Sequence, residues 1–537
     1  MQCVWGAELS EVYDIAVVGS GFAGSLLAMI ASRLGRRVVL IERGRHPRVV
    51  IGESSTPLSN LLLEELADRY DLPALQPLAK WGSWQRAYPE VACGLKRGFT
   101  FHHHVLGRPR TPDLGRRDQL LVAANPHDEI SDTHWYRADF DHFLVREAQR
   151  AGVAYVDEVK LERFVDGEDA VTLEGERNGR EVSFSAKFVV DATGSRGFLH
   201  KALGLGELEL PGFPATQALY SHFSGVGRLG EMTGGRILGW EDEPPYPIDD
   251  AAVHHVFDGG WVWVLRFNNG VTSAGVAATD EMASRLEFSD GAAAWERLLE
   301  LIPALKEQFE GAKPERPFTH IPRLGFRSAA MSVRKWALLP SAAGFVDPLL
   351  STGFPLTLLG VARLAKIFAE DWDSERFATR LQRYAAQTDG ELVATARLIG
   401  ALYANMKDFP VFVALSLLYF AGASFSETAR RLGKPHLAKS FLLYDDERFG
   451  PACAWLLERA MLARTEAESA KLSEDILRAI EPFNVAGLGN AERRNWYPVD
   501  AEDLIRAAHK VDASREEIVQ LLERCGFAPT LSAAQRR

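Results

Sequence analysis

The sequence predicts an α/β protein with a Rossmann-like dinucleotide-binding domain, an inserted antiparallel sheet and a helical C-terminal region. Three observations support this fold class. Residues 13–44 read as strand, glycine turn, helix and strand; residues 215–280 alternate polar and apolar; and residues after about 373 are patterned as helices. We expect an N-terminal extension over 1–12, a first domain over 13–372 with sheet segments inserted at about 80–130 and 200–330, and a helical region over 373–537.

The first segment, "YDIAVVGSGFAGSLLAMIASRLGRRVVLIERG", fits a dinucleotide-binding unit. Its glycines match G-x-G-x-x-G: Gly19 makes the turn, Gly21 lets the backbone approach a pyrophosphate, and Gly24 lets the helix pack on the strand. Glu42 ends the second strand, where a carboxylate binds ribose hydroxyls and disfavours a 2′-phosphate, although the adjacent Arg43 weakens that preference. The predicted cofactor-binding residues of this unit are Gly19, Gly21, Phe22, Ala23, Gly24, Glu42 and Arg43.

The later elements follow in chain order. Residues 132–153 read as a strand and an amphipathic helix, and residues 155–190 alternate like hairpins. Residues 188–199 form a strand entering a second glycine turn, and residues 336–372 form a strand, a loop and a long helix. The uncharged run at 409–425 is short for a membrane span and contains Pro410, so we expect a buried helix and no integral membrane span.

Composition excludes several function classes. The net charge of −11 disfavours nucleic acid as a partner. Four cysteines, at positions 3, 93, 453 and 525, are too scattered for a disulfide framework or a zinc site. The start of the chain lacks the pattern of a signal peptide, so we expect a cytoplasmic protein with reduced thiols and no metal.

Three motifs carry a resemblance to a known family. "VVGSGFAGS", "VVDATGSRGFL" and "AAGFVDPLLSTG" resemble the FAD-dependent oxidoreductases of the aromatic-hydroxylase fold, and "GESSTP" (52–57) with "GFVDPLLSTG" (344–353) resembles the flavin-dependent halogenases. The resemblance covers about residues 13–370 and implies FAD as cofactor. It adds six residues to the expected FAD site: Glu53, Ser54, Arg137, Asp191, Gly194 and Asp347. The alternative role of Arg137 is an ion pair with Asp139 or Asp141.

The same resemblance interprets "CGLKRGFTFHHH" (93–104). Lys96 matches the lysine that receives hypohalous acid formed at the flavin and presents it to the substrate, and Lys80 is a reserve candidate. An ammonium donates hydrogen bonds to an oxidant's oxygen, and a desolvated lysine can become a neutral amine. Neighbouring strand residues point to opposite faces, so at most His102 and His104 share a face, which argues against a metal site and favours one substrate-side histidine.

Two further segments bear on the chemistry. Trp261 and Trp263 match half of the halogenases' W-x-W-x-I-P segment as substrate-side candidates, but Leu265 and Arg266 replace its last two residues, and an alternating strand would give the same tryptophans. By resemblance, Ser351, Thr352 and Gly353 would bind a halide through backbone N–H groups. Tryptophan-specific halogenases have a glutamate before that serine; Leu350 stands here, so a phenol or pyrrole is the better fit.

The sequence therefore predicts a halogenase that uses reduced FAD from a separate flavin reductase, O2 and halide to halogenate an electron-rich aromatic substrate, free or carrier-bound. The absence of a second G-x-G-x-x-G agrees with reduction by another protein. Two alternatives stay open: a related FAD-dependent monooxygenase or dehydrogenase/reductase without halogenation, and a flavin-binding protein without turnover that docks a partner.

Overall fold

The computed structural model describes residues 12–109, 115–232, 243–462 and 464–527. The expected extension over 1–12 therefore lies outside the described residues except for Val12. Parts of both inserted segments (110–114 and 233–242) and the last ten residues of the C-terminal region (528–537) also lie outside them.

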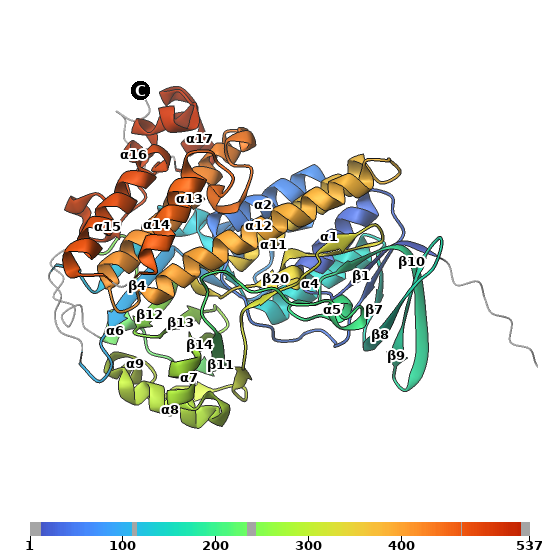
Figure 1. Cartoon of the computed structure of the whole chain (residues 1–537), viewed down its shortest axis with the longest axis horizontal. Coiled ribbons are helices and arrows are strands. Elements are labelled where there is room, and N and C mark those ends of the chain that lie inside the picture. The colour runs from blue at the N-terminus through green and yellow to red at the C-terminus, as the bar shows by residue number, and fades with distance from the viewer. Residues whose placement is uncertain (1–11, 110–114, 233–242, 463, 528–537) are drawn as a thin grey trace, which may run out of the picture.

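The first sheet carries the predicted dinucleotide-binding unit, on the right of Figure 1. Its strands are β1 (Tyr13–Val18), β2 (Val38–Ile41), β7 (Ala154–Val156), β8 (Val159–Asp166), β9 (Val171–Arg177), β10 (Arg180–Asp191), β18 (Ser332–Val333) and β19 (Trp336–Leu338). The order β18-β19-β10-β1-β2-β7 is parallel from β19 to β7, and β9 and β8 extend β10 as an antiparallel ribbon. β2 is buried throughout, which explains its continuous apolar run, because both faces of such a sheet are covered.

Helices cover this sheet and connect it to the rest of the chain. They are α1 (Phe22–Arg33), α2 (Pro57–Arg69), α3 (Trp81–Ala87), α4 (Arg137–Arg150), α5 (Phe198–Ala202), α10 (Pro340–Ala343) and α11 (Gly353–Glu370). α1 packs against both α4 and α11, and all its residues from Phe22 to Ala31 are buried. The sequence-predicted strand–turn–helix–strand unit is confirmed.

The second sheet brings distant segments together. Its strands are β4 (Gly98–His104), β5 (Gln119–Ala123), β11 (Thr216–Ser224), β12 (Ala252–Phe257), β13 (Gly260–Arg266), β14 (Thr272–Thr279), β15 (Lys313–Pro314), β16 (Thr319–Ile321) and β21 (Trp496–Tyr497). The order is β15-β11-β14-β13-β12-β4-β5-β21, with β16 on β11. It departs from the expected antiparallel sheet at two places, since β4 pairs with β12 and β5 with β21 in parallel. β21 also shows that the predicted helical region contributes a strand.

The two faces of the second sheet pack on different layers. Phe99, Phe101 and Trp261 lie on the face toward the long C-terminal helices, which we call the helix-side face. Val262 and Val264 lie on the opposite face, in a separate core with α7 (Asp280–Leu286), α8 (Ala292–Leu301) and α9 (Pro303–Gln308). Two short sheets, β3 (Cys93–Lys96) with β6 (Asp132–Trp135) and β17 (Phe326–Arg327) with β20 (Gly344–Phe345), complete the arrangement.

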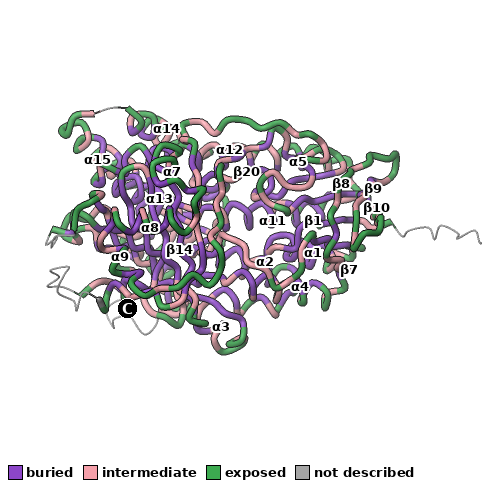
Figure 2. Tube along the Cα trace, turned by 90° about the horizontal axis from the view of Figure 1, so that it is seen from below, coloured by how far each residue is buried: buried purple, intermediate pink, exposed green. Residues whose placement is uncertain are grey.

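The C-terminal region is mainly helical, as predicted. Its helices are α12 (Phe377–Ala404), α13 (Phe409–Arg431), α14 (Phe449–Ala460), α15 (Glu466–Ile480), α16 (Ala501–Arg506) and α17 (Arg515–Arg524). Two helices, Leu349–Glu370 and Phe409–Arg431, are apolar and long enough to cross a membrane, yet 72% and 83% of their most apolar windows are buried inside the protein. Figure 2 shows the trace around α13 as buried, so the apolar run at 409–425 is a core helix here.

Candidate active site

The glycine turn after β1 has the geometry that the motif predicts. Gly19 has a φ of +99°, and a Cβ there would lie 2.7 Å from the carbonyl oxygen of Ala192. A Cβ on Gly24 would lie 2.0 Å from the carbonyl oxygen of Gly19. Both positions therefore require glycine, one for backbone conformation and one for close packing of α1 on the turn.

Two backbone positions near this turn face open space. A Cβ on Gly194 or on Gly353 would meet no atom within 4 Å. Gly194 follows the segment that contacts Gly19, and Gly353 precedes Phe354, whose ring lies 4.9 Å from that of Phe22 at the start of α1. Open backbone positions around a helix N-terminus suit a pyrophosphate, so the residues present fit FAD.

Glu42 is a fixed negative charge at the end of β2. Its carboxylate accepts hydrogen bonds from the Ser20 N–H (3.0 Å), the Ser20 hydroxyl (2.9 Å) and the Gly44 N–H (2.8 Å). Burial raises its pKa, but Arg48, at 3.1 Å, and these hydrogen bonds outweigh burial and lower the pKa to about 2. Arg43, the expected neighbour, is exposed, so Arg48 is the arginine that the fold places on Glu42.

Arg137 joins the GES segment to α4. Its guanidinium makes a two-bonded ion pair with Asp141 (2.8 and 2.7 Å) and donates to the carbonyl oxygen of Gly52 (2.9 Å). Of the two possible ion-pair partners of Arg137, Asp139 and Asp141, the structure shows Asp141. A Cβ on Gly21 would lie 3.4 Å from the same guanidinium, so Arg137 also borders the glycine turn. It fixes the loop of the GES segment beside the glycine turn.

The two acidic candidates Glu53 and Asp191 are held by the protein itself. Glu53 lies 2.9 Å from the His222 ring, and both side chains are buried. Asp191 accepts hydrogen bonds from the N–H groups of Thr193 (2.8 Å) and Leu199 (2.7 Å), while burial raises its pKa. Asp191 therefore shapes the second glycine turn.

Lys96 is fully buried at the end of β3. Its ammonium donates hydrogen bonds to the hydroxyl of Ser54 (2.9 Å) and to the carbonyl oxygen of Ser55, and it lies 3.8 Å from the centre of the Phe99 ring. Burial lowers its pKa to about 7, although the carboxylate of Asp132 opposes the decrease. The GES segment and the candidate lysine therefore meet, and burial favours the neutral form of the amine while the charge of Asp132 favours the ammonium. Lys80, the reserve candidate, is partly exposed and lies 3.5 Å from Glu64.

Asp347 links the tryptophan strand to the C-terminal helices. One carboxylate oxygen accepts from the Leu349 N–H (2.9 Å) and the Trp261 indole (3.2 Å), and the other accepts from the Tyr403 hydroxyl (2.9 Å). Burial raises the pKa of Asp347 to about 7. Trp263 instead donates to the Ser273 hydroxyl at 3.3 Å.

The strand β13 ends at Arg266, the position at which the halogenase segment has its proline. Leu265 is buried, and Arg266 donates to the carbonyl oxygens of Val226 (3.0 Å) and Gly227. Arg266 therefore anchors a neighbouring loop.

The predicted halide loop is a tight turn leading into α11. Leu350 and Ser351 both have positive φ (+63° and +56°), and the Ser351 N–H donates to the carbonyl oxygen of Pro348 at 3.0 Å. Thr352 is the N-cap residue of α11, which is 18 residues long. The first N–H groups of this helix have no acceptor within the helix. The backbone donors suited to an anion are thus the N–H groups of Gly353 and Phe354, because Pro355 has no N–H and the Leu356 N–H donates to the carbonyl oxygen of Thr352.

The histidines of β4 separate by strand alternation. His102 and His104 lie on the sheet face opposite to Trp261, where the Nε2 atom of His104 is 2.9 Å from the Nδ1 atom of His255. The interpretation of these two as substrate-side residues is therefore not supported by their position. His103 and His254 lie on the helix-side face instead, with His103 stacked on Phe409 and His254 on Phe101. Among the described residues, no group of three or more His, Cys, Asp or Glu side chains is arranged to hold a metal ion.

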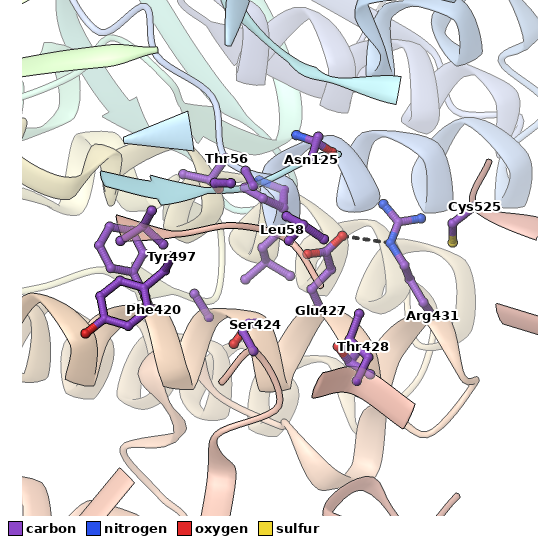
Figure 3. Close-up of a pocket in the computed structure, with 18 of the residues that line it drawn as sticks. Thr56, Leu58, Asn125, Phe420, Ser424, Glu427, Thr428, Arg431, Tyr497 and Cys525 are labelled. Atoms are coloured by element: carbon purple, nitrogen blue, oxygen red, sulfur yellow. Dashed lines mark hydrogen bonds and ion pairs between the residues drawn. The ribbon is translucent and has the colours of Figure 1, made fainter. Parts of the chain in front are cut away.

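A deep pocket lies between the second sheet, α13 and the C-terminal segment (Figure 3). Phe99 and Thr56 form part of its wall, so the pocket comes within one side chain of Lys96. Most of the wall is apolar, including Leu58, Phe420 and Tyr497. Its polar end holds Glu427 and Arg431, which are joined by a hydrogen bond of 2.8 Å. The pocket suits a largely apolar ring compound with a polar substituent.

Sequence reasoning missed several residues of this region. Asp132 and His134 of β6 lie beside Lys96, and Tyr403 bonds to Asp347 from a helix far along the chain. Polar residues in the buried strand "DTHW" could have been noticed, because buried polar side chains need a partner. Nothing in the sequence around Tyr403 distinguishes it from an ordinary core tyrosine.

Comparison with known proteins identifies the class. A sequence model of the tryptophan halogenase family matches residues 131–411, more than half of the chain. Monodechloroaminopyrrolnitrin halogenase PrnC of Pseudomonas fluorescens is 29% identical over 429 residues, covering 77% of this chain and 71% of that protein. Tetracycline 7-halogenase of Kitasatospora aureofaciens is 29% identical over 380 residues, covering 68% of this chain and 66% of that protein.

The fold agrees with this match. The crystal structure of halogenase PltM in complex with phloroglucinol and FAD superposes with a TM-score of 0.78 at 23% identity, covering 90% of this chain and 99% of that one. Fold and site define an FAD-dependent oxidoreductase. The chain belongs to the tryptophan halogenase family, the flavin-dependent halogenases.

Proposed function

We propose that this protein halogenates an electron-rich aromatic compound, with Lys96 as its catalytic residue. The observation that supports this most strongly is the position of Lys96: it is buried, bonded to the GES segment and in contact with Phe99, which lines the deep pocket. Reduced FAD, when bound, supplies with O2 the oxidising equivalent that turns halide into an electrophile. A separate flavin reductase is the proposed source of the reduced flavin, in line with the single glycine motif.

Each part of the site has a task in this proposal. The turn from Gly19 to Gly24 and the N-terminus of α1 bind the pyrophosphate, and Glu42 fixes the ribose end. The start of α11 holds the halide through backbone N–H groups. Lys96 donates hydrogen bonds to the hypohalous acid and directs its halogen toward the pocket.

We propose a phenol or a pyrrole as the substrate. Leu350 places no carboxylate before Ser351, so a substrate that activates itself through its own OH or NH fits this site. Two similar proteins are named as carrier-bound pyrrole halogenases, at 22% and 25% identity, and the PltM structure contains a phenol. The apolar wall of the pocket suits the ring of either class.

The test uses the purified protein with FAD, a flavin reductase, NADH, bromide and phloroglucinol, followed by mass spectrometry of the product. We expect a brominated product, and we expect its rate to fall about 100-fold or more in Lys96→Met, because a positioned donor contributes a factor of this size. Lys187→Met is the matched control, since Lys187 is exposed and pairs only with Asp14 in the described structure.

A second function is favoured by the departure at Leu265 and Arg266 from the halogenase segment. In that case the protein is a monooxygenase or dehydrogenase/reductase of the same fold. Flavin reoxidation with a hydroxylated or dehydrogenated product that is independent of bromide, and equal in Lys96→Met and wild type, would establish it.

A further inference from the structure

Lys96 has a buried carboxylate opposite it. Asp132 in β6 is the cross-strand partner of Lys96 in β3, so both side chains leave this two-stranded sheet on the same face. Lys96 is fully buried and Asp132 is 4% exposed. One oxygen of Asp132 accepts a hydrogen bond from the Asn60 amide at 2.7 Å, while the other, Oδ2, is buried and has no hydrogen-bond partner within the described residues.

The two groups influence each other's charge. Burial and the charge of Glu427 of α13 raise the pKa of Asp132, Lys96, Asn60 and Asn125 oppose the increase, and the net result is a pKa of about 7. The titratable groups around Lys96 on the neighbouring strands are His134 of β6 and His254 of β12. Burial and the charge of Lys96 lower the pKa of both histidines, so they remain neutral at pH 7. Asp132 is therefore the group that balances Lys96.

Other carboxylates near the site are already engaged. Glu53 pairs with His222, and Asp347 accepts three hydrogen bonds from Leu349, Trp261 and Tyr403. Position 350, before the predicted halide-binding residues, is a leucine. Asp132 differs from these carboxylates, because it is buried, has one oxygen without a hydrogen bond within the described residues and is the cross-strand partner of Lys96.

We propose that Asp132 is a positioning residue whose buried negative charge, opposite Lys96 on the neighbouring strand, keeps Lys96 protonated, so that the ammonium needed to bind the hypohalous acid persists at neutral pH. Asp132 Oδ2 makes no hydrogen bond to Nζ, which donates to Ser54 and Ser55, so the carboxylate acts on Lys96 through its charge and not by direct proton transfer. Asn60 holds the carboxylate in place. This inference rests on the proposed role of Lys96.

The first test is the pH dependence of bromination by Asp132→Asn. Without the negative charge, Lys96 gives up its proton at lower pH, so the alkaline limb of kcat/KM should move down by about one pH unit. Asp128→Asn is the matched control, because Asp128 lies four residues earlier, is largely exposed and pairs with Arg97. An unshifted alkaline limb in Asp132→Asn, with or without loss of rate, would overturn the proposal.

The second test needs neither flavin nor turnover. Urea unfolding at pH 7 is measured for wild type, Lys96→Met, Asp132→Asn and the double variant. Each single change leaves the partner's charge buried and unbalanced. If the two effects were independent, the unfolding constant of the double variant would be raised by the product of the two single increases. We expect the measured constant to be lower than this value by a factor of about five or more. Independent effects, agreeing within about twofold, would overturn the coupling. If wild type forms no brominated product, the proposed function fails while this cycle still decides whether the two residues are coupled.

Discussion

Asp347 shows how tertiary contacts change the chemistry of one residue. The sequence places it in a loop motif and suggests a contact with the cofactor. In the structure its oxygens accept hydrogen bonds from Trp261 of β13, Leu349 of its own loop and Tyr403 of α12. The pKa of a carboxyl group rises when the group is buried among neutral donors with no cation beside it.

This protonation has a measurable consequence for stability. The pKa of Asp347 rises from its usual 3.8 to about 7 in the folded protein, so the folded state binds the proton more tightly than the unfolded chain. The resulting stability is fully present below about pH 4 and is lost as pH rises through 7. In Asp347→Asn this dependence should disappear, and the free energy of unfolding of wild type relative to the variant should fall by about 1 kcal/mol per pH unit between pH 4 and 7.

Urea unfolding at pH 5, 6, 7 and 8 measures this difference. Parallel curves for wild type and Asp347→Asn would show that the carboxyl group is ionised in the folded protein. Tyr403→Phe provides a control that removes one hydrogen bond to Asp347 but keeps the titrating group.

Some of the remaining site residues could be predicted from a local sequence pattern, and others only from the pairing of strands. Lys96 was predicted from its position in a local pattern, and the structure places it against Ser54 and Ser55 of the GES segment. The face on which His102 and His104 lie could not be predicted, because alternation fixes only that they share one. Asp132 was missed because its partner is across a strand pair and not nearby in sequence.

At the scale of elements, the strand–turn–helix unit was predictable because its constraints are local. Apolar runs specify the buried strands, and the glycine spacing specifies the turn. The structure adds the contact behind the packing role expected of the third glycine: α1 passes so close to the turn that a methyl group on Gly24 would overlap the Gly19 carbonyl oxygen.

Gly24→Ala should therefore damage the dinucleotide-binding unit. The added Cβ would lie 2.0 Å from a backbone atom that cannot move aside, so we expect a loss of about 1–3 kcal/mol in the free energy of unfolding and weaker FAD binding. Gly206→Ala is the matched control, because its Cβ would make an ordinary contact of 3.6 Å with Ala329. Thermal melting and the flavin absorbance of the purified protein measure both effects, and equal values for the two variants would contradict the packing argument.

At the scale of the whole molecule, the pocket is built from segments that the sequence holds far apart. Thr56 precedes α2, Phe99 is on β4, Phe420 is on α13 and Leu521 is on α17. β21 pairs with β5 and brings the C-terminal segment over the same region. Figure 1 places α15–α17 away from β1 and β10, so the C-terminal end bounds the pocket and not the dinucleotide turn.

Leu521→Trp tests whether the C-terminal segment contributes to the substrate pocket and not to FAD binding. The larger ring should occupy part of the pocket, so a bulky phenol such as para-phenylphenol should bind more weakly, while FAD binding stays unchanged. We expect its KM to rise about tenfold, equivalent to about 1.4 kcal/mol, and the KM for phloroglucinol to rise less. Glu523→Gln on the exposed side of α17 is the control. Equal KM values in wild type and Leu521→Trp for both phenols would place the substrate elsewhere.

The sequence by itself determined the dinucleotide-binding unit, the buried nature of the apolar helix at 409–425 and the family resemblance that points to Lys96. These depend on contacts between neighbours in the chain, or on composition, which a single sequence displays. The tertiary structure alone decided that Asp132 opposes Lys96, that Tyr403 holds Asp347, and that the C-terminal segment completes the pocket. Those properties arise when distant segments pack, because burial and the partners it brings together set both charge and shape.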